Sequence, residues 1–246
     1  MVGLLTLNVA RPTRERAAGL LEWLWHRPVD LLVLTEVARG GGSELIAQVC
    51  REAGHSVLAS GCDDYGVLLV ARRGTLEPAP DVAVPPSFPG RLLPARWQGL
   101  LVLGVYGAAS DPVRYSSATQ RRRKRDWLAE LDLALGTLDV PEPCVLIGDL
   151  NVVAPGHGDP LPHVLPEETA FYHRLSEAHG FVDAHGVGPE VSWVDHSGVG
   201  CRYDHAFVSA DLAPRVVDCV LEHSSRVSGH TDHSALRLDL RLPSDP

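Results

Sequence analysis

The sequence has few cysteines, no long apolar run and no repeat at a fixed period, and these absences exclude several classes of protein. The first apolar run is too short for a signal peptide and follows no basic segment. No stretch reaches the roughly 20 apolar residues of a membrane helix, so no membrane association is expected. The cysteines are odd in number and form no CxxC pair, which predicts reduced, mostly buried thiols in a cytoplasmic protein: Cys50, Cys62, Cys144, Cys201 and Cys219.

Positive charge is also scarce, because the sequence has 22 Lys and Arg residues against 31 Asp and Glu residues, which gives a net charge of -9. This balance disfavours non-specific binding to nucleic acid, although it leaves room for a local basic face. A carboxylate-rich centre that needs a divalent cation would contribute to the same excess. With 45% hydrophobic and 22% charged residues, the 246-residue chain is expected to build a sizeable core, in one domain over residues 1–246.

Apolar runs of strand length recur along the chain, and segments with helical spacing separate some of them. The pattern predicts helices over 13–25, 43–53 and 166–179, and a further helix into which the basic run at 121–125 leads as a basic helix start. It predicts strands over 2–9, 30–37, 55–60, 65–72, 75–84, 92–97, 99–106, 144–147, 180–184, 192–193, 201–209, 215–222 and 234–242, with a turn at 61–64. Many strands and few helices indicate two sheets packed face to face with helices outside.

Polar side chains stand where many of these strands end, which places a site at the edge where strand ends meet. They are Asn8, Glu36, Tyr106, Asp149, Asn151, Asp204 and Asp232. Taken singly, most have a structural alternative. Glu36 could be a strand-end residue that reaches water, and Tyr106 could cap the core.

The stretch CVLIGDLN over 144–151 carries the sharpest signal. Asp149 and Asn151 are two residues apart, so both side chains share a face if the backbone stays extended. A carboxylate beside a carboxamide can position a water and hold a phosphoryl oxygen. Alternatively, GDLN is a loop start with two turn-forming residues.

The one strong charge run is RRRKR, which comprises Arg121, Arg122, Arg123, Lys124 and Arg125. Such a run can be a solvated helix face. It can also be a patch that contacts substrate phosphates, and the sequence leaves both interpretations open.

The motifs LTLN (Asn8), LTE (Glu36), GDLN, RYDHAFVS (Asp204) and TDHSA follow one another over essentially the whole chain. In this order they resemble the endonuclease/exonuclease/phosphatase superfamily. GVYG around Tyr106, GFVDA followed by SW, and KRDWLAEL are most similar to its exonuclease III and AP-endonuclease branch. The resemblance implies an α/β (α+β) fold, namely a four-layer sandwich of two mostly antiparallel sheets flanked by helices.

The chain also departs from that branch. Only eight residues separate Trp193 from Arg202, where abasic-site enzymes carry a longer loop that engages DNA. GAAS follows Tyr106 directly, and Thr231 stands where the family has Ser. These departures leave phosphodiesterase chemistry in place and make abasic-site specificity an open question.

The resemblance implies a divalent cation, Mg²⁺ with Mn²⁺ as a substitute. Glu36 would be its first ligand, with Asn8 close by and Asp232 as a second or outer ligand. Mg²⁺ prefers carboxylate, amide and water oxygens, and it can act on a phosphodiester as a Lewis acid and a charge clamp.

The resemblance also implies roles for the catalytic residues. Asp149 would orient or deprotonate the attacking water, and Asn151 would bind a non-bridging phosphate oxygen. His233 would donate to the phosphate while Asp204 fixes its tautomer. Tyr106 would contact the phosphate or assist the leaving oxygen.

Three functions follow as hypotheses. The first is a DNA nuclease of the exonuclease III or AP-endonuclease kind, with a role in DNA repair. The second is a phosphatase or phosphodiesterase for a small molecule that uses the same metal site. The third is a binding domain without activity, which the full set of catalytic positions disfavours. The sequence indicates no obligate protein partner.

Overall fold

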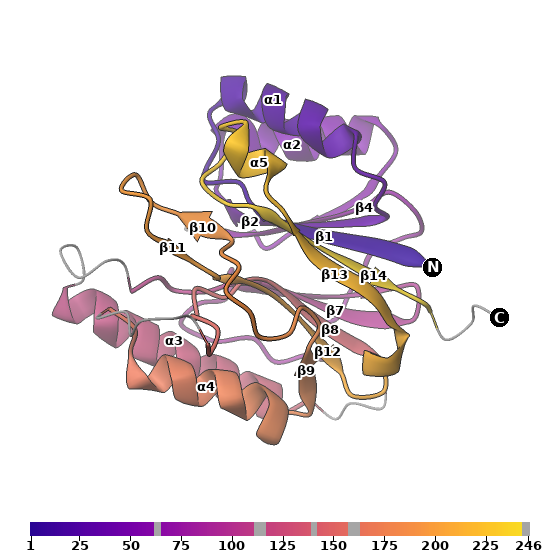
Figure 1. Cartoon of the computed structure of the whole chain (residues 1–246). Coiled ribbons are helices and arrows are strands. Elements are labelled where there is room, and N and C mark those ends of the chain that lie inside the picture. The colour runs from indigo at the N-terminus through magenta and orange to yellow at the C-terminus, as the bar shows by residue number, and fades with distance from the viewer. Residues whose placement is uncertain (62–64, 111–116, 139–141, 157–162, 243–246) are drawn as a thin grey trace.

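The computed structural model describes residues 1–61, 65–110, 117–138, 142–156 and 163–242. Two six-stranded sheets pack face to face, and helices cover both outer faces (Figure 1). The predicted four-layer α/β sandwich is therefore confirmed.

The first sheet combines strands from both ends of the chain. In spatial order they are β13 (Val216–Glu222), β14 (Ala235–Leu240), β1 (Val2–Asn8), β2 (Leu31–Val37), β4 (Gly66–Ala71) and β3 (Ser56–Ala59). All neighbours are antiparallel except β1 and β2. Because these two are parallel, Asn8 and Glu36 come to the same edge of the sheet.

The second sheet repeats this plan with the middle of the chain. In spatial order its strands are β5 (Glu77–Pro78), β6 (Leu92–Trp97), β7 (Leu100–Tyr106), β8 (Cys144–Asp149), β12 (Asp204–Ser209) and β9 (Phe181–Asp183). Only β7 and β8 are parallel neighbours, so Tyr106 and Asp149 end side by side. A separate two-stranded ribbon joins β10 (Trp193–Val194) to β11 (Gly200–Cys201).

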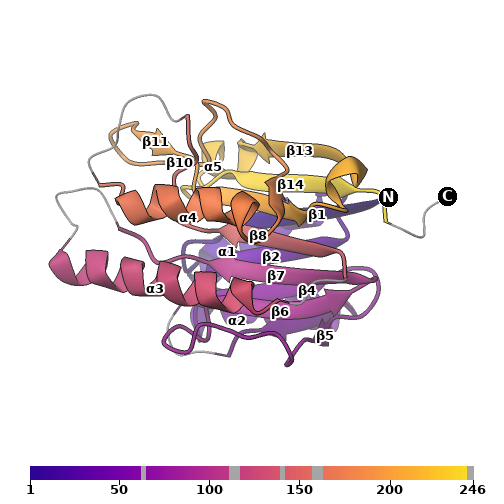
Figure 2. The same cartoon turned by 90° about the horizontal axis from the view of Figure 1, so that it is seen from below.

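Helices complete the outer layers. On the first sheet lie α1 (Arg14–Trp25), α2 (Gly41–Glu52) and the short α5 (Ser224–Val227), and on the second lie α3 (Ala118–Gly136) and α4 (Pro166–Glu177) (Figures 1 and 2). The predicted N-cap is confirmed, because the Thr13 hydroxyl accepts a hydrogen bond from the Arg16 amide at 3.2 Å. A single-turn 3₁₀ helix spans Ala213–Arg215.

The central core lies between the sheets and takes alternate residues of each strand, such as Val33 and Leu238 from one sheet and Val102 and Ile147 from the other. The intervening residues face the helices. Since both faces of the inner strands are covered, these strands read as continuous apolar runs in the sequence. The single domain over residues 1–246 stays a prediction, which this shared core supports.

Several boundaries differ from those predicted. The strand expected over 75–84 reduces to the two residues of β5, because Pro78 and Pro80 cannot donate ladder hydrogen bonds. The second helix begins at Gly41, before position 43, because Gly40 turns the chain with a φ of 80°. Most of the predicted turn at 61–64 lies outside the described residues.

Two further expectations from the sequence concern the cysteines and membrane-spanning helices. Cys50, Cys144 and Cys201 are buried and Cys219 is half-buried, all as free thiols, whereas Cys62 lies outside the described residues. In the part of the chain that the structure describes, no helix combines the length and apolarity needed to cross a membrane.

The basic run lies near the start of α3, because Ser117 and Gln120 form a capping box that starts the helix at Ala118. Lys124 faces inward and is 1% exposed. Its ammonium lies 2.9 Å from Glu168 Oε2, contacts the Ser110 hydroxyl, and donates to the Asn151 carbonyl. Lys124 therefore cannot contact a substrate phosphate, which corrects that part of the prediction. A helical period turns this one side chain of the run toward α4.

We expect Lys124→Met to destabilise the fold by about 3–5 kcal/mol, because it leaves the Glu168 carboxylate buried without its cation. The double variant Lys124→Met/Glu168→Leu should recover much of this loss, since it removes both charges. Arg122→Met, on the exposed face of the same helix, is the control and should stay within about 0.5 kcal/mol of the parent. Urea unfolding measures all four proteins. Equal losses for Lys124→Met and Arg122→Met would contradict the buried pair.

Candidate active site

A cleft of about 450 Å³ opens at the edge where the strand ends of both sheets meet. It is lined by Asn8, Glu36, Tyr65, Arg91, Tyr106, Ala109, Gln120, Arg123, Asp149, Asn151, Trp193, Tyr203, Asp232 and His233. The structure thus brings together seven of the eight predicted catalytic and metal residues in one cleft. The eighth, Asp204, is fully buried behind His233.

Glu36 reaches the cleft through a bulge. The pairing of β2 with β4 shifts register between Thr35 and Val37, and Glu36 between them adopts a φ of 57°. A bulge re-aims the side chain of a strand, and a left-handed conformation is strained for any residue other than glycine. Local strain therefore accompanies the placement of this carboxylate.

Asn8 joins the two sheets at the floor of the cleft. Its Nδ2 donates to Asp149 Oδ2 at 2.8 Å, and its Oδ1 accepts from the Ala10 amide at 2.9 Å. Burial raises the pKa of Glu36, and the nearby Asn8 side chain partly counters this rise. With both ends of its amide engaged, Asn8 holds the Asp149 carboxylate in place.

The GDLN turn is tighter than an extended strand. Gly148 has a φ of 152°, and a Cβ there would lie 1.9 Å from the Val105 carbonyl oxygen. Asp149 ends β8, and its Oδ1 accepts from the Asn151 amide at 2.9 Å. Asn151 then turns back with a φ of 53°, and its Nδ2 donates to the Gly107 carbonyl at 3.3 Å. Both side chains line the cleft, and they do so through the turn that the sequence offered as an alternative to an extended backbone.

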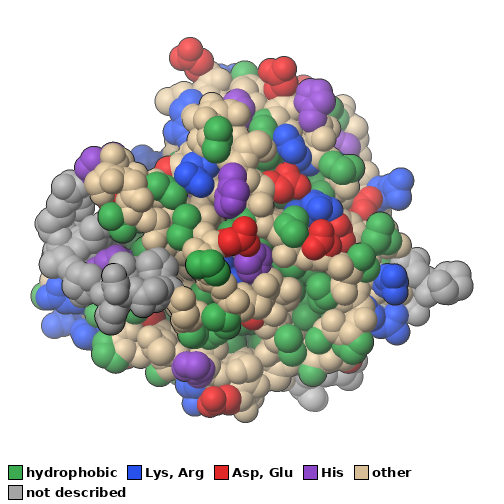
Figure 3. Space-filling view, viewed as in Figure 1, with side chains coloured by type: hydrophobic (Ala, Val, Ile, Leu, Met, Phe, Trp, Pro, Cys, Tyr) green, Lys and Arg blue, Asp and Glu red, His purple; other side chains and the backbone are tan. Residues whose placement is uncertain are grey.

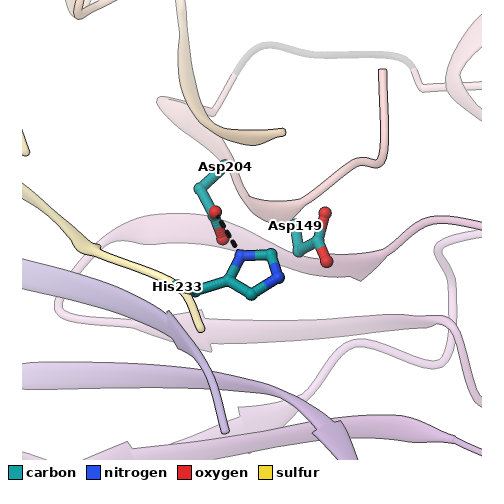
Figure 4. Close-up of side chains that lie close together, drawn as sticks. All are labelled: Asp149, Asp204 and His233. Carbon is teal, nitrogen blue, oxygen red and sulfur yellow. Dashed lines mark hydrogen bonds and ion pairs between the residues drawn. The ribbon is translucent and has the colours of Figure 1, made fainter. Parts of the chain in front are cut away.

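Asp204 and His233 form a buried pair (Figure 4). His233 Nδ1 lies 2.7 Å from Asp204 Oδ2, and Asp204 pairs with Asp149 in the register of β12 and β8. Burial lowers the pKa of His233, but the Asp204 charge and hydrogen bond, aided by Asp149 and Asp232, outweigh it and raise the pKa to about 9. The imidazole is therefore charged at neutral pH, with Nδ1 as the donor to Asp204.

Asp149 and Tyr106 of the cleft also have raised pKa values. Burial raises the pKa of Asp149, and the Asp204 charge raises it further. The pKa of the Tyr106 phenol is raised by burial and by the charges of Glu36 and Asp149. Asp149 is thus a stronger base than an ordinary carboxylate, and Tyr106 stays a neutral hydrogen-bond donor.

The donor set suits a hard divalent cation. Glu36, Asp149 and Asp232 contribute carboxylate oxygens to one cleft, beside the amide of Asn8. Burial raises the pKa of Glu36, and the charge of Asp232 adds to the rise. A cation between the two carboxylates would relieve this repulsion. Asp149, Asp204 and His233 also lie close enough to ligate an ion, but Nδ1 of His233 is already engaged with Asp204.

The remaining members of the basic run differ in their surroundings. Arg123 lines the cleft and lies over the Phe88 ring at 5.8 Å. Arg125 pairs with Glu167 at 2.7 Å. Arg122 is exposed and Arg121 half-buried. On the face seen in Figure 3, Lys and Arg side chains are interspersed with acidic ones and do not gather in one patch.

The sequence of this chain was also compared with models of known protein families. A model of the Endonuclease/Exonuclease/phosphatase family matches residues 5–245. The chain belongs to this family. This match confirms the superfamily predicted from the sequence. Members of the family are phosphoester hydrolases. No curated protein sequence matches significantly.

Solved structures of family enzymes have the same fold. An AP endonuclease from Archaeoglobus fulgidus matches with a TM-score of 0.82 at 23% identity, over 98% of this chain and all of that one. The 3′-5′ exonuclease NExo from Neisseria meningitidis matches with a TM-score of 0.80, and the 3′ phosphatase NExo from Neisseria bound to a product DNA hairpin with 0.79. Each of the latter two is 22% identical and covers 98% of this chain and all of its own. At such identities the structures establish a shared fold and not a shared substrate.

Some residues of the cleft wall were not predicted from the sequence, and Arg91 is the first of them. Arg91 is 4% exposed, donates to the Gly107 carbonyl at 2.6 Å and lies over the Tyr106 ring at 4.5 Å. A charged residue between a Pro-Gly turn and a buried strand is the signal that could have found it. Tyr65, Gln120 and Tyr203 carry no comparable signal in the sequence.

The strained position of Glu36 predicts an unusual ranking of variants. Glu36→Gly should be more stable than Glu36→Ala by about 1 kcal/mol, because glycine accepts a positive φ and alanine does not. Urea unfolding of the two variants without metal measures this difference. An alanine variant equal to or more stable than the glycine variant would contradict the left-handed bulge.

The Asp204–His233 pair predicts a shifted imidazole titration. In Asp204→Asn the main group that raises the pKa of His233 is lost, so the pKa should fall from about 9 toward or below neutrality. The charged form then disappears as the pH rises through 7, where the parent keeps it. NMR titration of the His233 ring protons reports both values, and an unchanged pKa in the variant would refute the assignment.

Proposed function

We propose that this protein is a divalent-metal-dependent phosphodiester hydrolase that acts on DNA. The observation that carries the proposal is the placement of His233, held by Asp204 at 2.7 Å, beside the carboxylate of Asp149 in one cleft. The raised pKa values of His233 and Asp149 support the same assignment. A proton donor and a proton acceptor are the two functions that hydrolysis of a phosphodiester by water requires.

Glu36 and Asp232, with Asn8 between Glu36 and Asp149, would hold Mg²⁺ or Mn²⁺. When bound, the cation supplies Lewis acidity and neutralises charge on the phosphate oxygens. The carboxyl and amide oxygens of these residues form the donor set that such cations prefer.

Asp149 accepts a proton from the attacking water. The raised pKa of this carboxyl supports that role, because a base close to the operating pH is the most effective one. Asn8 fixes its Oδ2 and the Asn151 amide fixes its Oδ1, so the carboxylate cannot rotate away.

His233 donates a hydrogen bond to a phosphoryl oxygen as negative charge builds up in the transition state. Its Nδ1 is turned to Asp204, and the opposite ring nitrogen faces the side of Asp149 (Figure 4). Asn151 binds a second phosphate oxygen. The neutral Tyr106 contacts the phosphate or the leaving oxygen.

Two features support DNA as the substrate. Arg91 and Arg123 add positive charge to a cleft whose walls also carry Tyr65 and Trp193, and aromatic rings can stack on bases. The NExo enzyme of the same fold binds a DNA hairpin product. A role in DNA repair and a cytoplasmic location belong to this proposal.

A small phosphoester is the second candidate substrate, and specific observations favour it. Lys124 is buried and Arg125 is paired, so the basic run offers fewer charges to a DNA backbone than its sequence indicates. The cleft volume of about 450 Å³ also lies in the range of small-molecule sites, about 300–1,000 Å³.

A substrate panel separates the two candidates. Abasic duplex, 3′-phosphate duplex, single-stranded DNA and small phosphoesters are incubated with enzyme and Mg²⁺, with and without EDTA. We expect cleavage of at least one DNA substrate at a higher kcat/KM than any small phosphoester, and loss of activity with EDTA. Turnover confined to small phosphoesters would replace DNA with the second candidate.

The same assay tests the catalytic residues. Asp149→Asn and His233→Ala should each lower kcat by about 10²–10⁴-fold, the usual contribution of acid-base groups, while the fold persists. Asp211→Asn and His173→Ala, at exposed positions away from the cleft lining, are matched controls that should retain activity. Full activity in either cleft variant would overturn the assigned roles.

A further inference from the structure

Trp193 contacts a residue that the proposed function assigns to the metal. Its indole Nε1 donates a hydrogen bond to Asp232 Oδ2 at 2.8 Å. The ring also forms part of the cleft wall and packs on Tyr203 with a centroid distance of 5.6 Å. The sequence indicates Trp193 only as part of a family motif, and the hydrogen bond connects it to a metal-site residue.

Backbone pairing fixes the same contact. Trp193 and His233 form an isolated antiparallel bridge, and the Ser234 amide donates to the Ser192 carbonyl at 2.6 Å. The Val194 amide donates to the Asp232 carbonyl at 3.4 Å. Residues 192–194 thus lie along residues 232–234, so the indole and the carboxylate are held opposite each other by main-chain contacts.

The segment that carries Trp193 is anchored on its other side as well. The Ser192 amide donates to the Cys201 carbonyl at 3.0 Å, and the Ser192 hydroxyl accepts from the amides of Tyr203 and Asp204. Asp195 closes the turn between β10 and β11 by accepting from the amides at 197 and 199. This short ribbon therefore has a defined place relative to Asp204 and His233.

The hydrogen bond leaves the two oxygens of Asp232 unequal. Oδ2 is engaged by the indole at 2.8 Å, whereas the one hydrogen-bond contact of Oδ1 among the described residues is a long one, 3.4 Å from the Thr231 hydroxyl. We propose that Trp193 is a positioning residue that orients Asp232 so that Oδ1 is available to the divalent cation. This inference rests on the proposed function, because it assumes that Asp232 takes part in the metal site.

Metal binding without substrate tests this role. The loss of free Mn²⁺ signal in electron paramagnetic resonance gives the Kd of Mn²⁺ for each purified protein. Trp193→Phe keeps an aromatic ring in the cleft wall, although a smaller one, and removes the indole donor, so we expect the Kd to rise about tenfold, as for other outer-shell partners of metal ligands. An Asp232→Ala background should abolish this effect, since Trp193 acts through Asp232.

Trp23→Phe is the matched control, because it removes an indole hydrogen bond to the Ser224 hydroxyl outside the cleft. Its Kd should stay within twofold of the parent. An unchanged Kd in Trp193→Phe, or the same tenfold rise in the Asp232→Ala background, would overturn the positioning role and leave the proposed function standing. A parent protein that binds no Mn²⁺ would overturn both, so the two failures are distinguishable.

Discussion

Two buried hydrogen bonds across the gap between the sheets are the constraint on which the site depends. Asn8 ends β1 of the first sheet and donates to Asp149 at the end of β8 of the second, at 2.8 Å. His233 precedes β14 of the first sheet and meets Asp204 at the start of β12 at 2.7 Å. Neither sheet contains the whole site. The catalytic groups therefore come together only when the two sheets pack against each other.

This arrangement concentrates acidic groups that would repel one another in isolation. Burial raises the pKa of both Asp149 and Glu36, and the charge of Asp204 on the first and of Asp232 on the second adds to the rise. The fold offsets the repulsion with a charged His233 and with amide donors from Asn8, and a divalent cation would complete the balance. Groups held against their preferred ionisation are typical of catalytic sites, and here they share one cleft with the strained backbone of Glu36.

The sequence predicted the fold and the cleft residues well because both depend on local signals. Apolar runs defined the strands, and motifs in a family's order identified residues such as Asn8 and His233. The bulge at Glu36 was not predictable, because a register shift depends on the partner strand. The burial of Lys124 was missed since its partner Glu168 lies 44 positions away, and the contact of Trp193 with Asp232 depends on how a short ribbon docks.

The central claim is that this cleft activates water to attack a phosphorus atom. Hydrolysis of a phosphodiester substrate by the Mg²⁺-supplemented enzyme in ¹⁸O-water, with mass spectrometry of the products, tests it most directly. The account predicts one ¹⁸O atom in the phosphoryl group of the product and none in the released alcohol. Unlabelled phosphate with a labelled alcohol, or cleavage without any incorporation of ¹⁸O, would show that the bond breaks by another route and would contradict the account.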